Sequence, residues 1–308
     1  MRKFLINVLK FSFLILVLTS LVVTLLIFTS TEKNLPAPNF SRNYSFNEKM
    51  RFIANHPKTI NTLALGSSMC LNNLDSKIII TELNSSKYIN AGVFSASIMD
   101  DYLLLKRLIK RYKIKTLLIS SNFIDFQKPG AEEIDYQMVE KFIHAKEDNR
   151  KYFILHNFNV RYLKENYANT TLNYDPYGAV KLDPKNFKIN IRRWNALFRG
   201  KVYYAKQYAY LDSIAKLCKE NEIKFIFFQS PIRNSLFLKY GGQKALRLHF
   251  QKTSEILKKN DQFYVNATSI TWDDRYFVDA IHLTEQGARR FTEYCFSVLK
   301  EKQESPQK

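Results

Sequence analysis

Short apolar runs alternate with stretches of helical spacing in two parts of this chain. The first part predicts strands at 62–65, 87–90 and 114–119 and helices at 74–83 and 101–112. The second predicts strands at 224–228 and near 263–265 and helices at 211–218 and 291–299. Strands that alternate with helices form parallel sheets covered on both faces. We therefore expect an α/β fold, a flavodoxin-like three-layer α/β/α sandwich with a mostly parallel central sheet.

The amino terminus carries a different pattern, an apolar run over residues 11–28 that only Ser and Thr interrupt. Roughly 20 residues of helix cross a hydrocarbon core of about 30 Å, so this run is long enough to span a membrane. The basic residues Arg2, Lys3 and Lys10 precede it, which places the rest of the chain on the exported side. We predict a retained, single-pass signal anchor over residues 1–30, with the carboxyl-terminal domain at the periplasmic or extracellular face. A cleaved signal peptide is the alternative.

The remainder divides into three parts by composition, and the second contains an insert. Residues 31–48, with Pro36 and Pro38, read as a stalk. The α/β domain is expected over 49–302, and 303–308 form a polar tail. Within the domain, the aromatic, basic and Asn-rich stretch at about 126–204 lacks a clear period. We interpret it as an inserted cap whose aromatic residues could cover the site or form a small core; Tyr174, Tyr177 and Trp194 are among them.

Charge and cysteine content narrow the partners. The chain of 308 residues has 47 Lys and Arg against 28 Asp and Glu, a net charge of +19 that favours anionic surroundings. An exported, tethered domain meets anionic lipid and acidic or phosphorylated polymers more readily than nucleic acid, so no nucleic-acid partner is expected. Three cysteines give no disulfide framework. No compact cluster has metal-ligand spacing, and we expect neither a metal nor a cofactor.

Two short segments carry the candidate chemistry. Gly66-Ser67-Ser68 falls on a predicted strand-to-helix turn, and Asp279 precedes His282 by three residues. A hydroxyl is a weak nucleophile at neutral pH, so it needs a base that takes its proton and a carboxylate that orients the base. The other four histidines lack an Asp three residues before them: His56, His144, His156 and His249. Each segment alone could be merely structural, but together they indicate a serine esterase or acyltransferase.

Four blocks in the chain resemble those of the SGNH/GDSL hydrolase family, and they occur in the same order. They are Gly66-Ser67-Ser68, Asn90-Ala91-Gly92, Ser121-Asn122 and Asp279-Ala280-Ile281-His282. The resemblance implies that Ser68 is the nucleophile, His282 the base and Asp279 the carboxylate that orients it. It also implies an oxyanion hole formed by the N–H groups of Ser68 and Gly92 and the side-chain amide of Asn122.

Two blocks depart from the family pattern. Ser67 replaces the usual Asp of the first block, and Ser120-Ser121-Asn122-Phe123 lacks both the Gly and the second acid of the usual Gly-x-Asn-Asp. Such relaxed versions resemble exported, membrane-anchored SGNH-like proteins that accompany membrane-bound O-acyltransferases and modify surface polysaccharides or teichoic acids.

The resemblance implies an exported esterase or O-acyltransferase that acts on acyl, most simply acetyl, esters of a cell-envelope polymer. A membrane-bound O-acyltransferase is then an expected partner beside the polymer itself. Because the blocks are incomplete, a non-catalytic envelope protein is the alternative hypothesis, one that keeps the fold as a glycan-binding or assembly-scaffold module.

Overall fold

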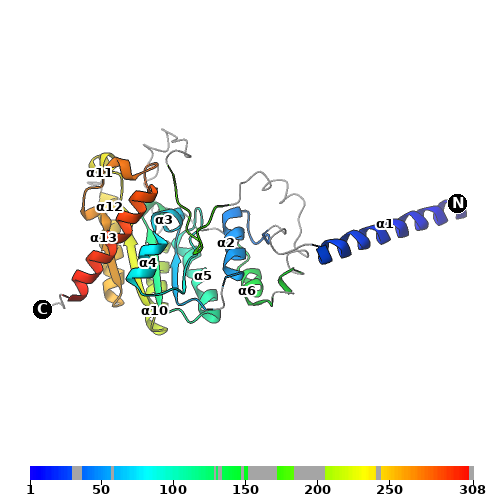
Figure 1. Ribbon diagram of the computed structural model, residues 1–308, viewed down its shortest axis with the longest axis horizontal. Coiled ribbons are helices and arrows are strands. Elements are labelled where there is room, and N and C mark those ends of the chain that lie inside the picture. Colours follow the sequence, from blue (N-terminus) through cyan, green and yellow to red (C-terminus); the bar gives the residue numbers. More distant parts are fainter. Residues whose placement is uncertain are drawn as a thin grey trace.

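The centre of the protein is a five-stranded sheet in which every neighbouring pair of strands is parallel. The computed structural model describes residues 1–29, 37–56, 59–127, 130, 134–146, 149–151, 172–183, 205–240 and 244–304. The strands are β1 (Thr62–Leu65), β2 (Tyr88–Asn90), β3 (Thr116–Ser121), β4 (Lys224–Gln229) and β5 (Phe263–Asn266). Their order across the sheet is β2-β1-β3-β4-β5, which is the flavodoxin-like order (Figure 1). The predicted fold class is confirmed.

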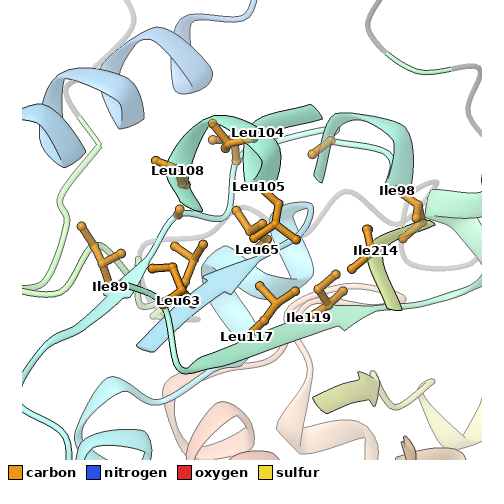
Figure 2. Close-up of a cluster of buried hydrophobic side chains, with 14 of the residues drawn as sticks. Leu63, Leu65, Ile89, Ile98, Leu104, Leu105, Leu108, Leu117, Ile119 and Ile214 are labelled. Atoms are coloured by element: carbon orange, nitrogen blue, oxygen red, sulfur yellow. The ribbon is translucent and has the colours of Figure 1, made fainter. Parts of the chain in front are cut away.

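Alternate residues of the strands pack into two separate cores, as the period of two in a strand requires. On one face, Leu63 and Leu65 of β1 and Leu117 and Ile119 of β3 belong to the larger core. Figure 2 shows these side chains directed toward the helix that follows β2. On the other face, the intervening residues such as Leu118 belong to a second core. Because almost every residue of β1, β3 and β4 is buried, these strands read in the sequence as largely apolar runs.

The larger core is covered by helices on one side of the sheet. They are α2 (Tyr44–Ala54), α5 (Ile98–Arg111), α6 (Tyr136–His144), α10 (Ala205–Glu220) and α12 (Lys244–Lys259). α5 begins with a capping box in which the Ser97 hydroxyl accepts from the N–H of Asp100 and the Asp100 carboxylate accepts from the N–H of Ser97. Leu104, Leu105 and Leu108 then face the sheet from successive turns.

The second core lies under three helices on the opposite face. They are α3 (Ser68–Asn73), α4 (Ser76–Glu82) and α13 (Glu285–Glu304). The sequence predicts one helix at 74–83, whereas the structure has two, because Leu74 is extended and Asp75 caps the start of α4. The short helix α11 (Asn234–Tyr240) follows β4 near a smaller apolar cluster. The three layers therefore consist of helices, sheet and helices.

The amino-terminal helix α1 (Arg2–Thr29) is long and apolar enough to cross a membrane, with a mean hydropathy of 2.4 in the most apolar part of Arg2–Leu25. Chain from Ala37 onward is already folded, earlier than the predicted start of the domain at 49. The Phe40 side chain is buried, its ring centroid lies 5.3 Å from that of Phe142, and its N–H donates to Asn47 Oδ1 at 3.1 Å. Part of the predicted stalk is therefore packed against the domain.

Described parts of the predicted insert contact the body of the domain rather than standing apart from it. α6 contributes Tyr136, Val139, Phe142 and Ile143 to the larger core. Residues 172–183 cross the carboxyl edge of the sheet: Asn90 N–H donates to Tyr177 O at 2.7 Å, and Val180 N–H donates to Leu71 O at 3.0 Å. Trp194, expected in the cap, lies outside the described residues.

Lys49 of α2 is a fully buried cation beneath residues 172–183. Its ammonium donates to the carbonyl oxygens of Asn90 and Gly178, and it lies 4.0 Å from the centroid of the Tyr174 ring. Burial lowers the pKa of Lys49 to about 7, although the nearby Cys70 and Asp175 oppose the shift. Folding therefore releases a proton from Lys49 between pH 7 and the ordinary Lys pKa of 10.5.

This release predicts a pH dependence of stability with a definite sign. Because the unfolded chain binds more protons, the contribution of Lys49 to the free energy of unfolding rises as the pH increases from about 7 toward 10, by up to about 1.4 kcal/mol per pH unit. Denaturation of the full chain in detergent micelles at several pH values, beside Lys49→Met, measures it. We expect the wild-type advantage over the variant to grow with pH, and parallel curves would contradict the assignment.

Candidate active site

The turn after β1 places Ser68 at the carboxyl edge of the sheet. Gly66 has φ of +142°, and a Cβ there would lie 2.8 Å from the carbonyl oxygen of Ser120 on β3, so the turn requires glycine. Ser67 caps α3 by accepting from the N–H of Met69 at 3.3 Å. Ser68 is the first residue of α3 and is partly exposed.

The structure brings Ser68, His282 and Asp279 together in one chain of hydrogen bonds. His282 Nε2 lies 2.7 Å from Ser68 Oγ, and His282 Nδ1 lies 2.7 Å from Asp279 Oδ2. The other carboxylate oxygen of Asp279 accepts from the N–H groups of Ile281 and His282, at 2.9 and 2.8 Å. A carboxylate only accepts, so Nδ1 carries the proton and Nε2 is left to accept from the Ser68 hydroxyl.

The surroundings of Asp279 keep its carboxylate ionised. Burial raises its pKa. The hydrogen bond and charge of His282, together with the N–H groups of Ile281 and His282, lower the pKa by more than burial raises it, so the net pKa lies below the ordinary value. The side chains of His282 and Asp279 are 19% and 14% exposed, so both are largely buried but part of the imidazole stays accessible. Asp279 is thus ionised across the neutral pH range, as the orienting role requires.

Asn73, at the end of α3, holds the turn that carries His282. Its Nδ2 donates to Ile281 O at 3.0 Å and its Oδ1 accepts from Leu283 N–H at 2.9 Å, so one carboxamide brackets His282. The same helix therefore carries Ser68 at its start and the support of the base at its end. Sequence reasoning missed Asn73, because these contacts join residues 208 and 210 positions apart.

Asn122 has a buried hydrogen-bond donor at the strand end next to the Ser68 turn. It follows β3, the neighbour of β1 in the sheet. Its Oδ1 accepts from the N–H of Ile124 at 2.8 Å, which fixes the orientation of the side chain. Its Nδ2 is buried and has no hydrogen-bond partner among the described residues. An amide donor left over in this way suits an oxygen that is supplied from outside the protein. Ser68 N–H, in the first turn of α3, has no acceptor within the helix either.

The predicted oxyanion role of Gly92 is not supported by the structure. Its N–H donates to Asn90 Oδ1 at 2.9 Å, so this hydrogen is used within the fold. A Cβ at Gly92 would lie 2.7 Å from the backbone nitrogen of Leu71, which shows that glycine is needed for the loop after β2 to approach α3. Gly92 therefore supports the nucleophile helix by packing.

Asp125 is a second residue that sequence reasoning missed. It lies in the 3-10 helix η1 (Phe123–Gln127), and its Oδ2 accepts from the hydroxyls of Ser67 and Ser121, both at 2.8 Å. The available signal was the absence of both acids from the first and third blocks. A carboxylate three residues beyond Asn122 occupies the region that those acids leave empty.

Two other side chains with catalytic chemistry, Cys70 and His249, are buried in the fold and have structural roles. Cys70 is fully buried, and burial raises the pKa of its thiol, so it packs as an apolar residue rather than acting as a nucleophile. His249 is buried between Tyr208 and Gln229, at 2.9 and 2.8 Å from its two ring nitrogens, and burial lowers its pKa to about 3. Among the described residues, no three His, Cys, Asp or Glu side chains gather so as to hold a metal ion.

Comparison with known proteins adds likeness to several solved structures. No protein-family model matches the chain, and no curated protein matches it. A GDSL-like lipase from Bacteroides thetaiotaomicron is 11% identical, with 84% of this chain and 98% of that chain covered and a TM-score of 0.42. A lipase/acylhydrolase from Enterococcus faecalis is 13% identical, with 79% and 96% covered and a TM-score of 0.40.

An acetyl xylan esterase is also similar, at 11% identity, with 78% of this chain and 100% of that chain covered and a TM-score of 0.43. Because these identities and TM-scores are low, the chemistry of the site is inferred from its own geometry alone. Fold and site together define a parallel α/β sandwich with a Ser-His-Asp arrangement at the carboxyl edge.

The support from Asn73 can be tested by stability. Asn73→Ala leaves the buried N–H of Leu283 and the carbonyl of Ile281 without their partner, so we expect a loss of about 1–3 kcal/mol in the free energy of unfolding. Asn72→Ala is the matched control, because Asn72 is a buried neighbour on α3 whose Oδ1 has no partner among the described residues. Chemical denaturation should show the larger loss of stability for Asn73→Ala. Equal losses would contradict the supporting role of the two Asn73 hydrogen bonds.

Proposed function

We propose that the chain is an exported, membrane-anchored serine esterase or O-acyltransferase that acts on acyl esters, most simply acetyl esters, of a cell-envelope polysaccharide or related polymer. The observation that carries the proposal is the hydrogen-bonded chain from Ser68 Oγ through His282 to Asp279 Oδ2, with both links at 2.7 Å. This arrangement makes a hydroxyl nucleophilic at neutral pH, which a structural serine does not need.

The first half of the reaction forms an acyl-enzyme. Ser68 Oγ attacks the ester carbonyl carbon while His282 Nε2 takes its proton. Asp279 stabilises the resulting imidazolium through Nδ1, and the N–H groups of Ile281 and His282 hold Asp279 itself in place. His282 then returns the proton to the leaving alkoxide, so the alcohol of the ester departs and the acyl group remains on Ser68.

Two hydrogen-bond donors stabilise the negative charge that develops on the carbonyl oxygen. Asn122 Nδ2 is buried, oriented and without a partner among the described residues, and Ser68 N–H lies in the first turn of α3. Preorganised donors of this kind stabilise a transition state by about 3–4 kcal/mol each. Gly92 is not part of this set, because its N–H already donates to Asn90.

The second half of the reaction releases the acyl group. His282 takes a proton from the acceptor as the acceptor attacks the acyl-enzyme carbonyl, and returns that proton to Ser68 Oγ as the bond between Oγ and the acyl group breaks. Water as the acceptor gives hydrolysis, and a sugar hydroxyl gives transfer. The two outcomes share every step before this one, so the same Ser68, His282 and Asp279 serve an esterase and an O-acyltransferase. Exclusion of water from the site decides between them.

Two features support an envelope polymer as the substrate. α1 has the length and hydropathy of a membrane span. When Arg2, Lys3 and Lys10 are set aside, the remaining chain keeps a net charge of about +16, which suits anionic surroundings. A membrane-bound O-acyltransferase is the proposed partner where an acyl donor has to be supplied.

Turnover of an aryl acetate by the full chain in detergent micelles tests the proposal. The wild-type protein should release the phenol, and both Ser68→Ala and His282→Ala should lower kcat by about 10³-fold or more, because each removes one member of the proton path. Activity that is absent from the wild-type protein, or unchanged in Ser68→Ala, would instead support the non-catalytic scaffold.

Asn122 is tested by separating kcat from KM in the same assay. Asn122→Ala removes a donor that acts only on the developing oxyanion, so kcat should fall by about 10²–10³-fold while KM changes little. Asn266→Ala is the matched control, since Asn266 also ends a strand but caps η3 (Ala267–Ser269) at the β5 edge of the sheet. A rise in KM with unchanged kcat would show that Asn122 binds the ground state instead.

A further inference from the structure

One buried carboxylate joins the ends of two strands beside the proposed nucleophile. Asp125 is 1% exposed, and its Oδ2 accepts from Ser67 Oγ and Ser121 Oγ, both at 2.8 Å. Ser67 immediately precedes Ser68 and follows β1, whereas Ser121 ends β3. A hydrogen bond to a charged acceptor is about twice as strong as one between neutral groups, so two such bonds to one oxygen tie these strand ends firmly.

The same residue completes the turn that presents Asn122. Asp125 N–H donates to Asn122 O at 3.1 Å, while Ile124 N–H donates to Asn122 Oδ1 at 2.8 Å. The backbone of Asp125 therefore supports the Asn122 turn, and its side chain reaches back to Ser67 beside the nucleophile. One residue thus contacts both parts of the site that must keep a fixed separation during acyl transfer.

Its position explains how the first and third blocks can lack their acids. Ser67 and Phe123 stand where the usual blocks carry Asp. Two hydroxyl groups, those of Ser67 and Ser121, instead converge on the carboxylate of Asp125. The negative charge remains buried between the two strand ends, although it now belongs to η1. The incomplete blocks are in this respect compensated rather than lost.

We propose that Asp125 is a positioning residue that, through the hydroxyls of Ser67 and Ser121, holds the nucleophile turn of Ser68 at a fixed distance from the oxyanion donor Asn122. This inference rests on the proposed function. A displacement of reacting groups by about 1 Å costs on the order of 100-fold in rate. Loss of Asp125 should therefore lower kcat while the affinity for substrate stays nearly the same.

Kinetics of the full chain in detergent micelles with an aryl acetate test the proposal. Asp125→Ala should lower kcat by about 100-fold and Asp125→Asn by about 10-fold, since Asn keeps an acceptor but loses the charge. KM should stay within about threefold. Asp100→Asn is the matched control: Asp100 is also buried and accepts from Ser97 and Tyr136 hydroxyls, but it caps α5. It should lower Tm comparably without lowering kcat.

A carboxylate swap provides a rescue. In Ser67→Asp combined with Asp125→Ser, the acid returns to the first block, where Asp also caps a helix well, and a hydroxyl replaces it in η1. We expect the kcat of the double variant to be at least about tenfold higher than that of Asp125→Ser alone. Failure of this recovery, or a kcat of Asp125→Asn equal to that of Asp100→Asn, would overturn the positioning role. An inactive wild-type protein would instead overturn the proposed function.

The link itself is measured independently of activity by thermal unfolding. Ser67→Ala and Asp125→Ala each remove the same hydrogen bond, so the decrease in Tm of the double variant should be smaller than the sum of the two single decreases. Additive decreases would show that the two side chains do not act together, and the inference would then be wrong even in an active enzyme.

Discussion

The two hydrogen bonds of the Asn73 carboxamide are the interaction on which the geometry of the site depends. They fix the turn of His282 against α3, the helix that begins with Ser68. The nucleophile and the support of its base thus belong to one rigid element of six residues. Because the two segments are more than 200 residues apart in the chain, nothing local could bring them to 2.7 Å from each other. A buried amide with both of its groups satisfied does so.

The parallel sheet explains why polar residues collect at one edge. Each strand runs in the same direction, so the residues that follow β1, β3 and β4 meet there. Most of them satisfy one another: the hydroxyls of Ser120 and Ser230 are 2.9 Å apart, and Gln229 contacts His249. The buried Asn122 Nδ2 lacks a partner among the described residues, and it is the donor that we propose for a ligand oxygen.

Periodicity was sufficient to predict the sheet and its parallel sense, because buried strands and amphipathic helices leave clear patterns. The order of the motifs led to Ser68, Asp279, His282 and Asn122, and the structure joins the first three by hydrogen bonds; their catalytic roles stay predictions. Sequence reasoning failed where a role depends on a contact rather than on a motif. Asn73 acts across the chain, and Asp125 replaces acids that the blocks lack. Gly92 matched the pattern, but Asn90 at i−2 already binds its N–H.

The central claim is that His282 activates Ser68, and covalent labelling tests it most directly. The full-length protein in detergent micelles is treated with a serine-reactive fluorophosphonate, and the modified peptide is located by mass spectrometry. The hydrogen-bonded geometry predicts a single adduct on Ser68 that His282→Ala abolishes, while Ser67 and Ser121 remain unmodified. No adduct on Ser68, or one that forms equally well in His282→Ala, would contradict the account.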